Sequence, residues 1–132
     1  MKLKLIFLCF NVFIVSFTNA QDGKASKTYS IRNTAWKFYL QEPINDTTIW
    51  RFANDSSLIE TKKGENLVYG LFSMAHDTLT FHDEGGLYHC PSFQIAQYKI
   101  VIKDDWLTLD LIDDDCIGRS AIINGAKLKR FK

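Results

Sequence analysis

Hydrophobic and polar residues alternate with a period of two through most of the chain after residue 35. In the clearest case, Leu107, Leu109 and Leu111 are separated by Thr108 and Asp110. This period is typical of a half-buried β-strand, because successive side chains of a strand point to opposite faces of its sheet. No amphipathic helix of useful length is predicted. The pattern predicts nine short strands, at 36–41, 49–53, 58–62, 67–73, 78–82, 98–103, 106–111, 119–123 and 127–131.

Short turn sequences separate these segments, which indicates that neighbours in the chain pair in antiparallel fashion. Asn124-Gly125 lies between the last two segments and is the strongest hairpin signal of the sequence. An antiparallel meander leaves hydrogen-bonding edges exposed unless it closes on itself. We therefore expect an all-β fold, a small up-and-down barrel of about eight strands, with a two-sheet sandwich as the alternative. A barrel of that size holds side chains or one small ligand in its interior.

The first 20 residues have the pattern of a secretory signal peptide. Two lysines precede an apolar run over 5–17, and the small residues Thr18 and Ala20 allow cleavage after Ala20. The run is shorter than the ~20 residues that cross a bilayer, so an uncleaved anchor is the less favoured alternative. We expect an exported protein, periplasmic or extracellular. Its parts are a signal peptide at 1–20, a flexible lead-in at 21–33 and a barrel domain at 34–132.

Composition and charge narrow the class of protein. The 132 residues are 46% apolar and include only 2 Pro and 7 Gly, which excludes a disordered or collagen-like chain and indicates one small domain. Cleavage removes two lysines and no acid, so the mature chain has 14 basic and 15 acidic residues and a net charge of −1. Because binding to nucleic acid relies on a basic surplus, we predict no nucleic-acid partner. We also predict no stable membrane span after cleavage.

Two cysteines remain once the leader is removed. Cys90 and Cys116 form an even pair in a compartment that is expected to be oxidising, and neither belongs to a C-x-x-C motif. We predict a disulfide between them, with two free thiols or a metal-binding pair as the alternatives. Closing a loop of about 27 residues stabilises a fold by about 3.5 kcal/mol in the chain-entropy model.

The C-terminal half carries a recognisable set of motifs. These are Tyr98, the strand around Leu107-Thr108-Leu109, and the D-x-C-x-x-R pattern of Asp114, Cys116 and Arg119, with Cys90 as an earlier cysteine before the tyrosine. Over 79–131 the chain resembles small exported bacterial lipocalin-like (calycin-type) barrels, most of which are uncharacterised. Trp36 resembles the first-strand tryptophan that opens such barrels. The resemblance implies that Arg119 or Arg130 packs across Trp36 and closes one end of the barrel, a structural role.

Candidate chemistry is sparse. His82, His89, Asp83 and Cys90 flank one turn and could approach a zinc set, but solvent-facing histidines are the favoured interpretation. The spacing of Asp113, Asp115 and Gly118 matches part of a calcium loop, yet the closing glutamate is absent and a solvated turn is favoured. No nucleophile motif occurs, and Ser73, His76 and Asp77 lie together by coincidence at a strand end. We therefore expect no enzyme activity, no catalytic residues, no metal and no cofactor.

The remaining signal is an excess of aromatic residues on the predicted strands. Apolar pockets with a few polar groups are the usual ligand sites, and a barrel mouth is one of their locations. We therefore interpret five of these residues as the lining of a ligand cavity, with plain core packing as the alternative: Trp50, Phe52, Tyr69, Phe81 and Tyr98. The leading hypothesis is a non-enzymatic exported barrel that binds a small apolar or amphipathic molecule. The alternative hypothesis is a protein-interaction module, such as an inhibitor of an envelope or secreted enzyme.

Overall fold

The computed structural model describes residues 29–132, which form eight β-strands and one short helix. The predicted signal peptide and the first part of the lead-in lie outside these residues. In chain order the elements are β1 (Thr34–Leu40), β2 (Asp46–Phe52), β3 (Ser56–Thr61), β4 (Asn66–Ala75), β5 (Thr78–Gly85), β6 (Ala96–Lys103), β7 (Trp106–Asp114), α1 (Ile117–Ile123) and β8 (Lys127–Phe131).

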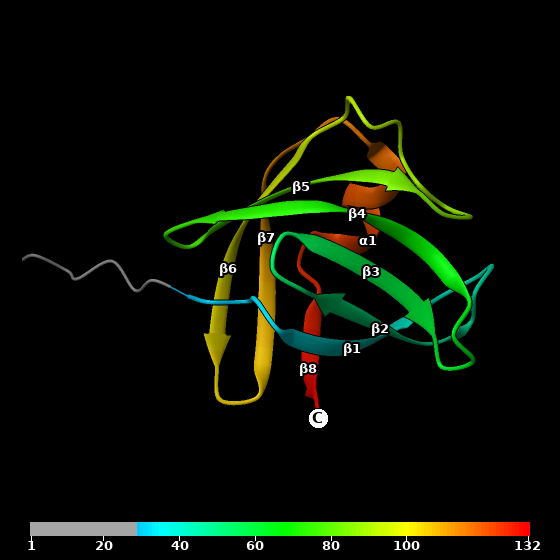
Figure 1. Cartoon of the computed structure of the whole chain (residues 1–132), viewed down its shortest axis with the longest axis horizontal. Helices are drawn as coiled ribbons and strands as arrows, with labels where there is room; N and C mark the ends of the chain where they lie inside the picture. Colours follow the sequence, from blue (N-terminus) through cyan, green and yellow to red (C-terminus); the bar gives the residue numbers. More distant parts are fainter. Residues whose placement is uncertain (1–28) are drawn as a thin grey trace, which may run out of the picture.

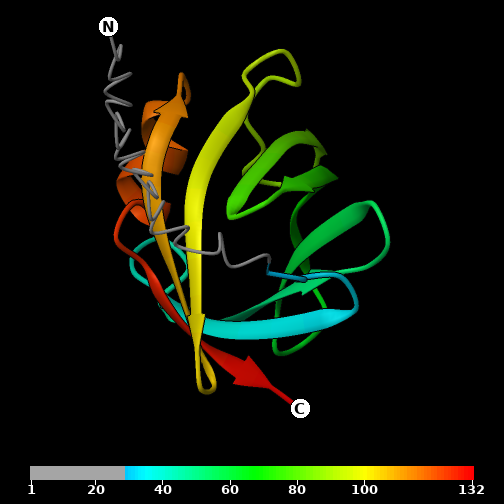
Figure 2. The same cartoon turned by 90° about the vertical axis from the view of Figure 1, so that its left-hand side faces the viewer.

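The strands form a closed barrel in which each pairs with its neighbours in the chain (Figures 1 and 2). Every pairing is antiparallel, and β8 closes the barrel against β1 through the pairs Ala35–Phe131, Trp36–Arg130 and Lys37–Lys129. The all-β, eight-stranded, up-and-down barrel is thus confirmed, and the sandwich is not observed. Closure gives the edge strands partners, which is the physical reason for preferring it.

The prediction of a strand over 119–123 is wrong, as is the hairpin at Asn124-Gly125. This segment is α1, and Asn124-Gly125 ends that helix instead. Gly125 has a φ of 76°, the left-handed conformation that commonly follows the last helical turn and that glycine adopts without strain. Arg119 and Ile123 are the buried residues of α1 and lie four apart, on one side of the helix. A segment this short contains only one pair of buried residues four apart. One pair is too little to distinguish the period of a helix from the period of two of a strand.

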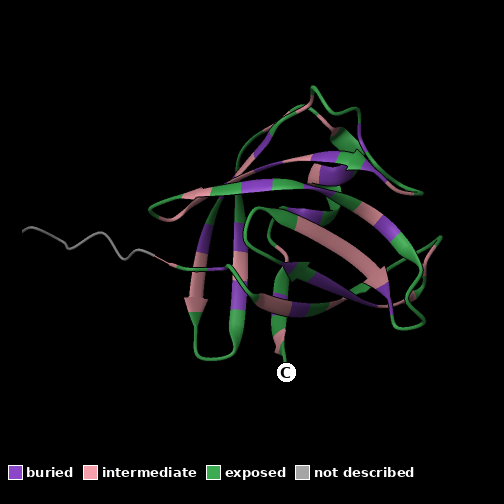
Figure 3. Cartoon of the chain, in the orientation of Figure 1, coloured by how far each residue is buried: buried purple, intermediate pink, exposed green. Residues whose placement is uncertain are grey.

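Inward-pointing residues of the strands form a continuous apolar core. Burial alternates along the strands, as Figure 3 shows for β4 and β7. Trp36, Trp50 and Tyr98 are the largest fully buried side chains, and aliphatic residues from β5 to β8 pack with them. The core therefore has contributions from strands all around the barrel.

The lead-in is packed at its C-terminal end, contrary to the prediction that it is flexible throughout. Ile31 is fully buried within the core, and Tyr29 packs against it. The Arg32 Nε donates a hydrogen bond to the carbonyl oxygen of Asn54, 2.7 Å away, and the guanidinium lies over the ring of Phe72. One apolar residue in a polar stretch carries little signal in a sequence, yet Ile31 is part of the buried core.

The two ends of the barrel differ in their connections. At one end, here called the closed end, residues 29–33 and three tight turns at 53–55, 76–77 and 104–105 cover the core. At the other, here called the open end, the connections are 41–45, 62–65, 86–95 and 115–126, the last of which contains α1. In Figure 1 the longest of them, 86–95 and the segment leading to α1, rise at the top of the view. None of the helices in the described part of the chain is long and apolar enough to cross a membrane.

Candidate ligand site at the open end of the barrel

A cavity of about 690 Å³ occupies the open end, where the core stops short of the barrel mouth. Its walls come from β1 to β5, from the connections 41–45 and 86–95, and from the inner side of α1. The volume lies within the range typical of small-molecule sites. Most of the wall is apolar, and its main contributors are Phe38, Leu40, Ile44, Trp50, Ile59, Leu67, Phe81 and Ile123.

The five residues predicted to line a cavity are separated by the structure into three groups. Trp50 and Phe81 line the cavity. Phe52 and Tyr98 are buried but belong to the packed core rather than to the cavity wall. Tyr69 lies on the outer face.

The prediction for Tyr69 is wrong because its strand is apolar on both faces. Phe72 and Gly70 of β4 are buried, so the period of two turns Tyr69 outward, where it is 47% exposed. A register shift between Tyr69 and Gly70 marks a bulge in the pairing with β5. The outward ring covers Gly85, where an added Cβ would clash with the tyrosine oxygen. Tyr69 therefore stabilises the sheet from outside.

Aromatic rings form the floor of the cavity. The rings of Trp50 and Phe81 meet edge to face with centroids 5.4 Å apart, and Phe81 stacks on Tyr98 at 5.9 Å. Trp50 also contacts Phe52 at 4.8 Å, which joins this floor to the core of the closed end. Such pairs add rigidity beyond the burial of their area.

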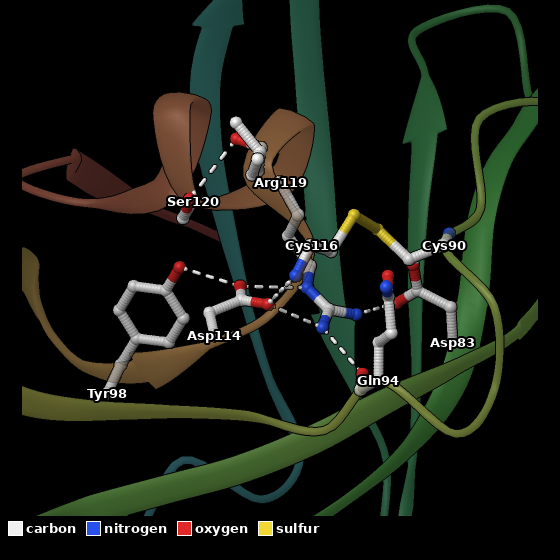
Figure 4. Close-up of a disulfide and its surroundings, with 9 residues drawn as sticks. Asp83, Cys90, Gln94, Tyr98, Asp114, Cys116, Arg119 and Ser120 are labelled. Atoms are coloured by element: carbon white, nitrogen blue, oxygen red, sulfur yellow. Dashed lines mark hydrogen bonds and ion pairs between the residues drawn. A yellow bond between two sulfur atoms is a disulfide. The ribbon is translucent and has the colours of Figure 1, made fainter.

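Beside this floor lies a buried ionic cluster centred on Arg119 (Figure 4). Its Nε and Nη2 donate to the two carboxylate oxygens of Asp114, at 2.9 and 2.8 Å, in a bidentate arrangement. Nη2 also donates to the carbonyl oxygen of Gln94 at 2.7 Å, and Nη1 lies 3.2 Å from Asp83 Oδ1. Both Arg119 and Asp83 line the cavity.

Asp114 is the most heavily bonded member of this cluster. Its side chain is 0% exposed and accepts four hydrogen bonds, two from Arg119, one from Tyr98 Oη at 2.9 Å and one from the backbone N–H of Cys116 at 3.0 Å. Burial alone would raise the pKa of Asp114, but these hydrogen bonds and the guanidinium charge outweigh it and hold that pKa below its usual value. Burial and Asp114 together raise the pKa of Tyr98 well above its usual value.

The predicted disulfide is confirmed, and it is coupled to the ionic cluster. Cys90 and Cys116 are bonded, with their Cα atoms 6.3 Å apart. The backbone N–H of Cys90 donates to Asp83 Oδ2 at 2.7 Å, while that of Cys116 donates to Asp114. One covalent bridge and one ionic bridge thus join the 86–95 connection and the strand end before it to the start of α1. Within the D-x-C-x-x-R motif, Asp114 accepts hydrogen bonds from both the backbone of Cys116 and the side chain of Arg119.

Of the two arginines expected to pack across Trp36, Arg130 does and Arg119 does not. The Arg130 guanidinium lies 4.4 Å from the centre of the Trp36 ring, because the two residues are directly paired between β8 and β1. The helix carries Arg119 to the opposite end of the barrel, where it lies 5.2 Å from the Phe81 ring instead. A strand over 119–123 would not have taken it there.

Two buried nitrogen atoms in the described residues have no hydrogen-bond partner within the protein, and both belong to side chains that line the cavity. They are Nε1 of Trp50 and Nη1 of Arg119. The ion pair of Nη1 with Asp83 is not aligned as a hydrogen bond. No pattern in the sequence marks either atom, because the helix that carries Arg119 and the cavity depend on the tertiary structure.

The residues that the sequence suggested as possible metal ligands make other contacts in the structure. His82 pairs with Glu84 on the same strand at 2.6 Å, His89 contacts the carbonyl oxygen of Gly86 at 2.8 Å, and Cys90 is in the disulfide. Within residues 29–132, no group of three His, Cys, Asp or Glu side chains is placed to hold a metal ion.

Comparison of the chain with protein-family models, with curated proteins and with solved structures finds no match.

Proposed function

We propose that this protein is an exported, non-enzymatic barrel that binds a small apolar or amphipathic molecule in its open-end cavity. The observation that carries the proposal is the cavity itself, about 690 Å³ with a predominantly apolar wall. A cavity of this size beside a packed core forgoes packing contacts, since interiors are otherwise close-packed. A ligand seated on Trp50 and Phe81 would restore that packing.

The polar groups of the site support a binding role over a catalytic one. Asp114 is saturated by four hydrogen bonds, and Asp83 is engaged by Arg119 and by the backbone of Cys90. A general acid or base must exchange its proton with a substrate near neutral pH. The pKa of Asp114 is held below its usual value by its hydrogen bonds and by Arg119, which suits that carboxylate to a structural role.

Two observations support export. The Cys90–Cys116 disulfide fits an oxidising compartment, and the first 20 residues have the pattern of a signal peptide. The relationship to lipocalin-like proteins is part of the same proposal. The up-and-down barrel and the contact of Arg130 with Trp36 are both features that this resemblance implies.

Native mass spectrometry of the protein, purified from a bacterial host that exports it through its own leader, tests the proposal. We expect a small additional mass that is retained under gentle ionisation and lost on denaturation. Extraction of the protein with organic solvent should then identify that molecule. A protein that carries no additional mass and takes up no apolar compound from a mixed-lipid extract would contradict the proposal.

Gly118 offers a matched pair of control variants for this test. It lines the cavity, and an added Cβ there meets no atom within 4 Å. Gly118→Phe therefore places a ring at the cavity without a backbone clash and should reduce the retained mass, whereas Gly118→Ala should leave it unchanged. Equal retention by the two variants would locate the molecule elsewhere on the protein.

A protein-interaction role is the second candidate, and exposed apolar residues at the open end favour it. Phe93 is 79% and Ile117 83% exposed, and Leu87 and Ile122 are exposed near them in the chain. Clusters of this kind mark interaction surfaces. A photoreactive phenylalanine analogue at position 93 should form one discrete protein adduct in the exporting host, and Ile117→Ser should weaken it. The absence of any discrete adduct would contradict this candidate.

A further inference from the structure

A groove rich in lysines and aromatic rings lies on the outer face of the barrel, at the strands that close it. We infer that this outer groove docks the protein on the surface of a membrane that contains anionic phospholipids. The partner is a lipid surface with phosphate head groups, bound from outside the barrel. This inference goes beyond the proposed function and does not require the open-end cavity to hold a ligand.

The alternation along the strands places the cations of the outer groove on the outside. Lys127 and Lys129 flank the buried Leu128 of β8. Lys37 follows the buried Trp36 of β1. Because successive side chains of a strand point to opposite faces, these three lysines point away from the core. The groove has a volume of about 560 Å³, and its lining contains no carboxylate but four lysines: Lys37, Lys62, Lys127 and Lys129.

These four positive charges are not neutralised by the part of the chain that the structure describes. Within residues 29–132, none of the four lysines takes part in an ion pair. Glu60 lies in the same row of paired residues as Lys37, beyond Ile49, but its carboxylate accepts from Arg51 Nε at 2.6 Å. The outer groove is therefore a local excess of positive charge on a mature chain whose net charge is −1.

The pairing of β1 with β8 sets two of these lysines directly opposite each other. Lys37 is the register partner of Lys129. Like charges at directly opposed positions of an antiparallel pair are destabilising. Lysines also protect exposed strand edges, but these two are paired with each other in a closed barrel. The fold thus keeps a repulsive pair on its surface, and an anionic partner would relieve that repulsion.

Trp106 holds two of the ammonium groups in place. The Nζ atoms of Lys127 and Lys129 lie 4.6 and 5.0 Å from the centre of its ring, within the range of cation–π attraction. Trp106 is also the register partner of Lys129 between β7 and β8. One ring therefore restricts both lysine side chains before a partner arrives, which reduces the entropy lost when they bind an anion.

The exposed rings of the outer groove favour a lipid surface over a soluble acidic partner. Tyr39, Trp106 and Phe131 all line the groove and are all exposed. At the surface of a bilayer an anionic phosphate lies directly above an apolar layer, and tryptophan and tyrosine are enriched at that depth. An acidic polymer without apolar groups would neutralise the lysines and leave the three rings in water. A membrane complements both parts of the groove.

Vesicle co-sedimentation of the mature protein, residues 21–132, tests the inference. We expect binding to vesicles of phosphatidylcholine and phosphatidylglycerol in equal amounts, and at least about tenfold weaker binding to phosphatidylcholine alone, because several lysines near an anionic surface add their attractions. Binding should fall steeply at about 1 M NaCl, where the screening length is about 3 Å. A folded protein that does not bind the anionic vesicles, or whose binding is insensitive to salt, would overturn the inference and leave the proposed function standing.

Two double variants with the same change of charge locate the contact. Lys37→Gln with Lys129→Gln removes two cations of the outer groove, and Lys63→Gln with Lys99→Gln removes two exposed cations that do not line it. The first pair should weaken binding to the anionic vesicles about tenfold or more, and the second by less than about twofold. The groove variant should be at least as stable as the unmutated protein, because it removes the opposed charges. Equal weakening by the two double variants would overturn the role of the groove.

The fluorescence of Trp106 reports the contact in the unmutated protein. Trp106 is 37% exposed, whereas Trp36 and Trp50, the other two tryptophans of the chain, are almost completely buried. Phosphatidylglycerol with brominated acyl chains should therefore quench the emission of Trp106 when the vesicles bind. Soluble polyglutamate, an acidic polymer without apolar groups, should bind at least about tenfold more weakly than the anionic vesicles. Vesicle binding without quenching, or equal affinity for polyglutamate, would overturn the assignment to a lipid surface.

Discussion

The two ends of this barrel are stabilised by different kinds of interaction. The closed end is covered by tight turns and by residues 29–33, and its charged contacts include Arg130 over Trp36 and Arg32 over Phe72. The open end has long connections, a helix, a disulfide and a buried ion cluster around Arg119. Apolar packing stabilises the first, whereas the second is held by a few strong, specific links around a hollow.

This difference indicates why a small barrel can keep a cavity at all. Long connections have much conformational entropy to lose, and apolar contacts within a hollow cannot compensate for that loss. The disulfide and the Asp83–Arg119–Asp114 cluster tie the 86–95 and 115–126 connections together from the side, without filling the space between them. The cavity at the open end is thereby bordered by connections that are linked to each other.

The strongest test of this contrast removes a cation from each end. Arg119→Met leaves Asp83 and Asp114 buried without their partner, and loss of one member of a buried ion pair typically costs about 3–5 kcal/mol of unfolding free energy. Arg130→Met at the closed end removes a cation–π contact and should cost about 1 kcal/mol. Urea unfolding followed by circular dichroism measures both. Equal losses would show that the ionic cluster has no special role.

Removal of the disulfide should have the next largest effect. Cys116→Ser opens the loop that the Cys90–Cys116 bond closes and should lower the unfolding free energy by about 3.5 kcal/mol. Lys62→Ala, at an exposed position of another connection, should change it by less than about 0.5 kcal/mol. Hydrogen exchange in the Cys116→Ser protein should accelerate first in 86–95 and 115–126. Equal melting temperatures for the two variants would remove the disulfide from the account.

The two buried tryptophans allow a finer comparison, because the same substitution removes a satisfied donor at one end and an unsatisfied donor at the other. Trp36→Phe loses the hydrogen bond to Thr34 and weakens the contact with Arg130, while Trp50→Phe loses no hydrogen bond within the protein. In ligand-free protein we expect Trp36→Phe to be the more destabilising by about 1–2 kcal/mol. A larger loss for Trp50→Phe in thermal unfolding would contradict this interpretation of the cavity wall.

The smallest expected effect is the pH dependence that the open end confers. The folded-state pKa of Asp114 is lowered, so its contribution to stability is complete above its unfolded pKa of about 4 and is lost as the pH falls through the folded value. The folded-state pKa of Tyr98 is raised, so its contribution is complete below about pH 10 and is lost as the pH rises beyond that. Urea unfolding across the pH range should show both losses, and Tyr98→Phe should abolish much of the alkaline one. If the loss of stability at alkaline pH is unchanged in that variant, it arises from other groups.

The strands were predicted best where the alternation of apolar and polar residues is repeated along the chain. Eight of the nine predicted strands match strands of the barrel, and the pairing of the cysteines follows from their number and the expected compartment. The prediction was least successful at the open end, where α1 was interpreted as a strand and Tyr69 as cavity lining. The seven residues of α1 contain only one helical repeat, so their pattern does not distinguish a helix from a strand. Because β4 is apolar on both faces, its pattern does not show which face points inward.

The sequence by itself determined the class of fold, because alternation with a period of two along many short segments leaves few ways to bury one face of each strand. The sequence also predicted the disulfide, and its resemblance to lipocalin-like barrels implied that Arg119 or Arg130 packs across Trp36. Only the tertiary structure decided that Arg119 turns away from Trp36, that Asp83 meets Asp114 across it, and that two buried N–H groups are left without a partner. Such features depend on how connections far apart in the chain fold over one barrel end, and no local pattern records that arrangement.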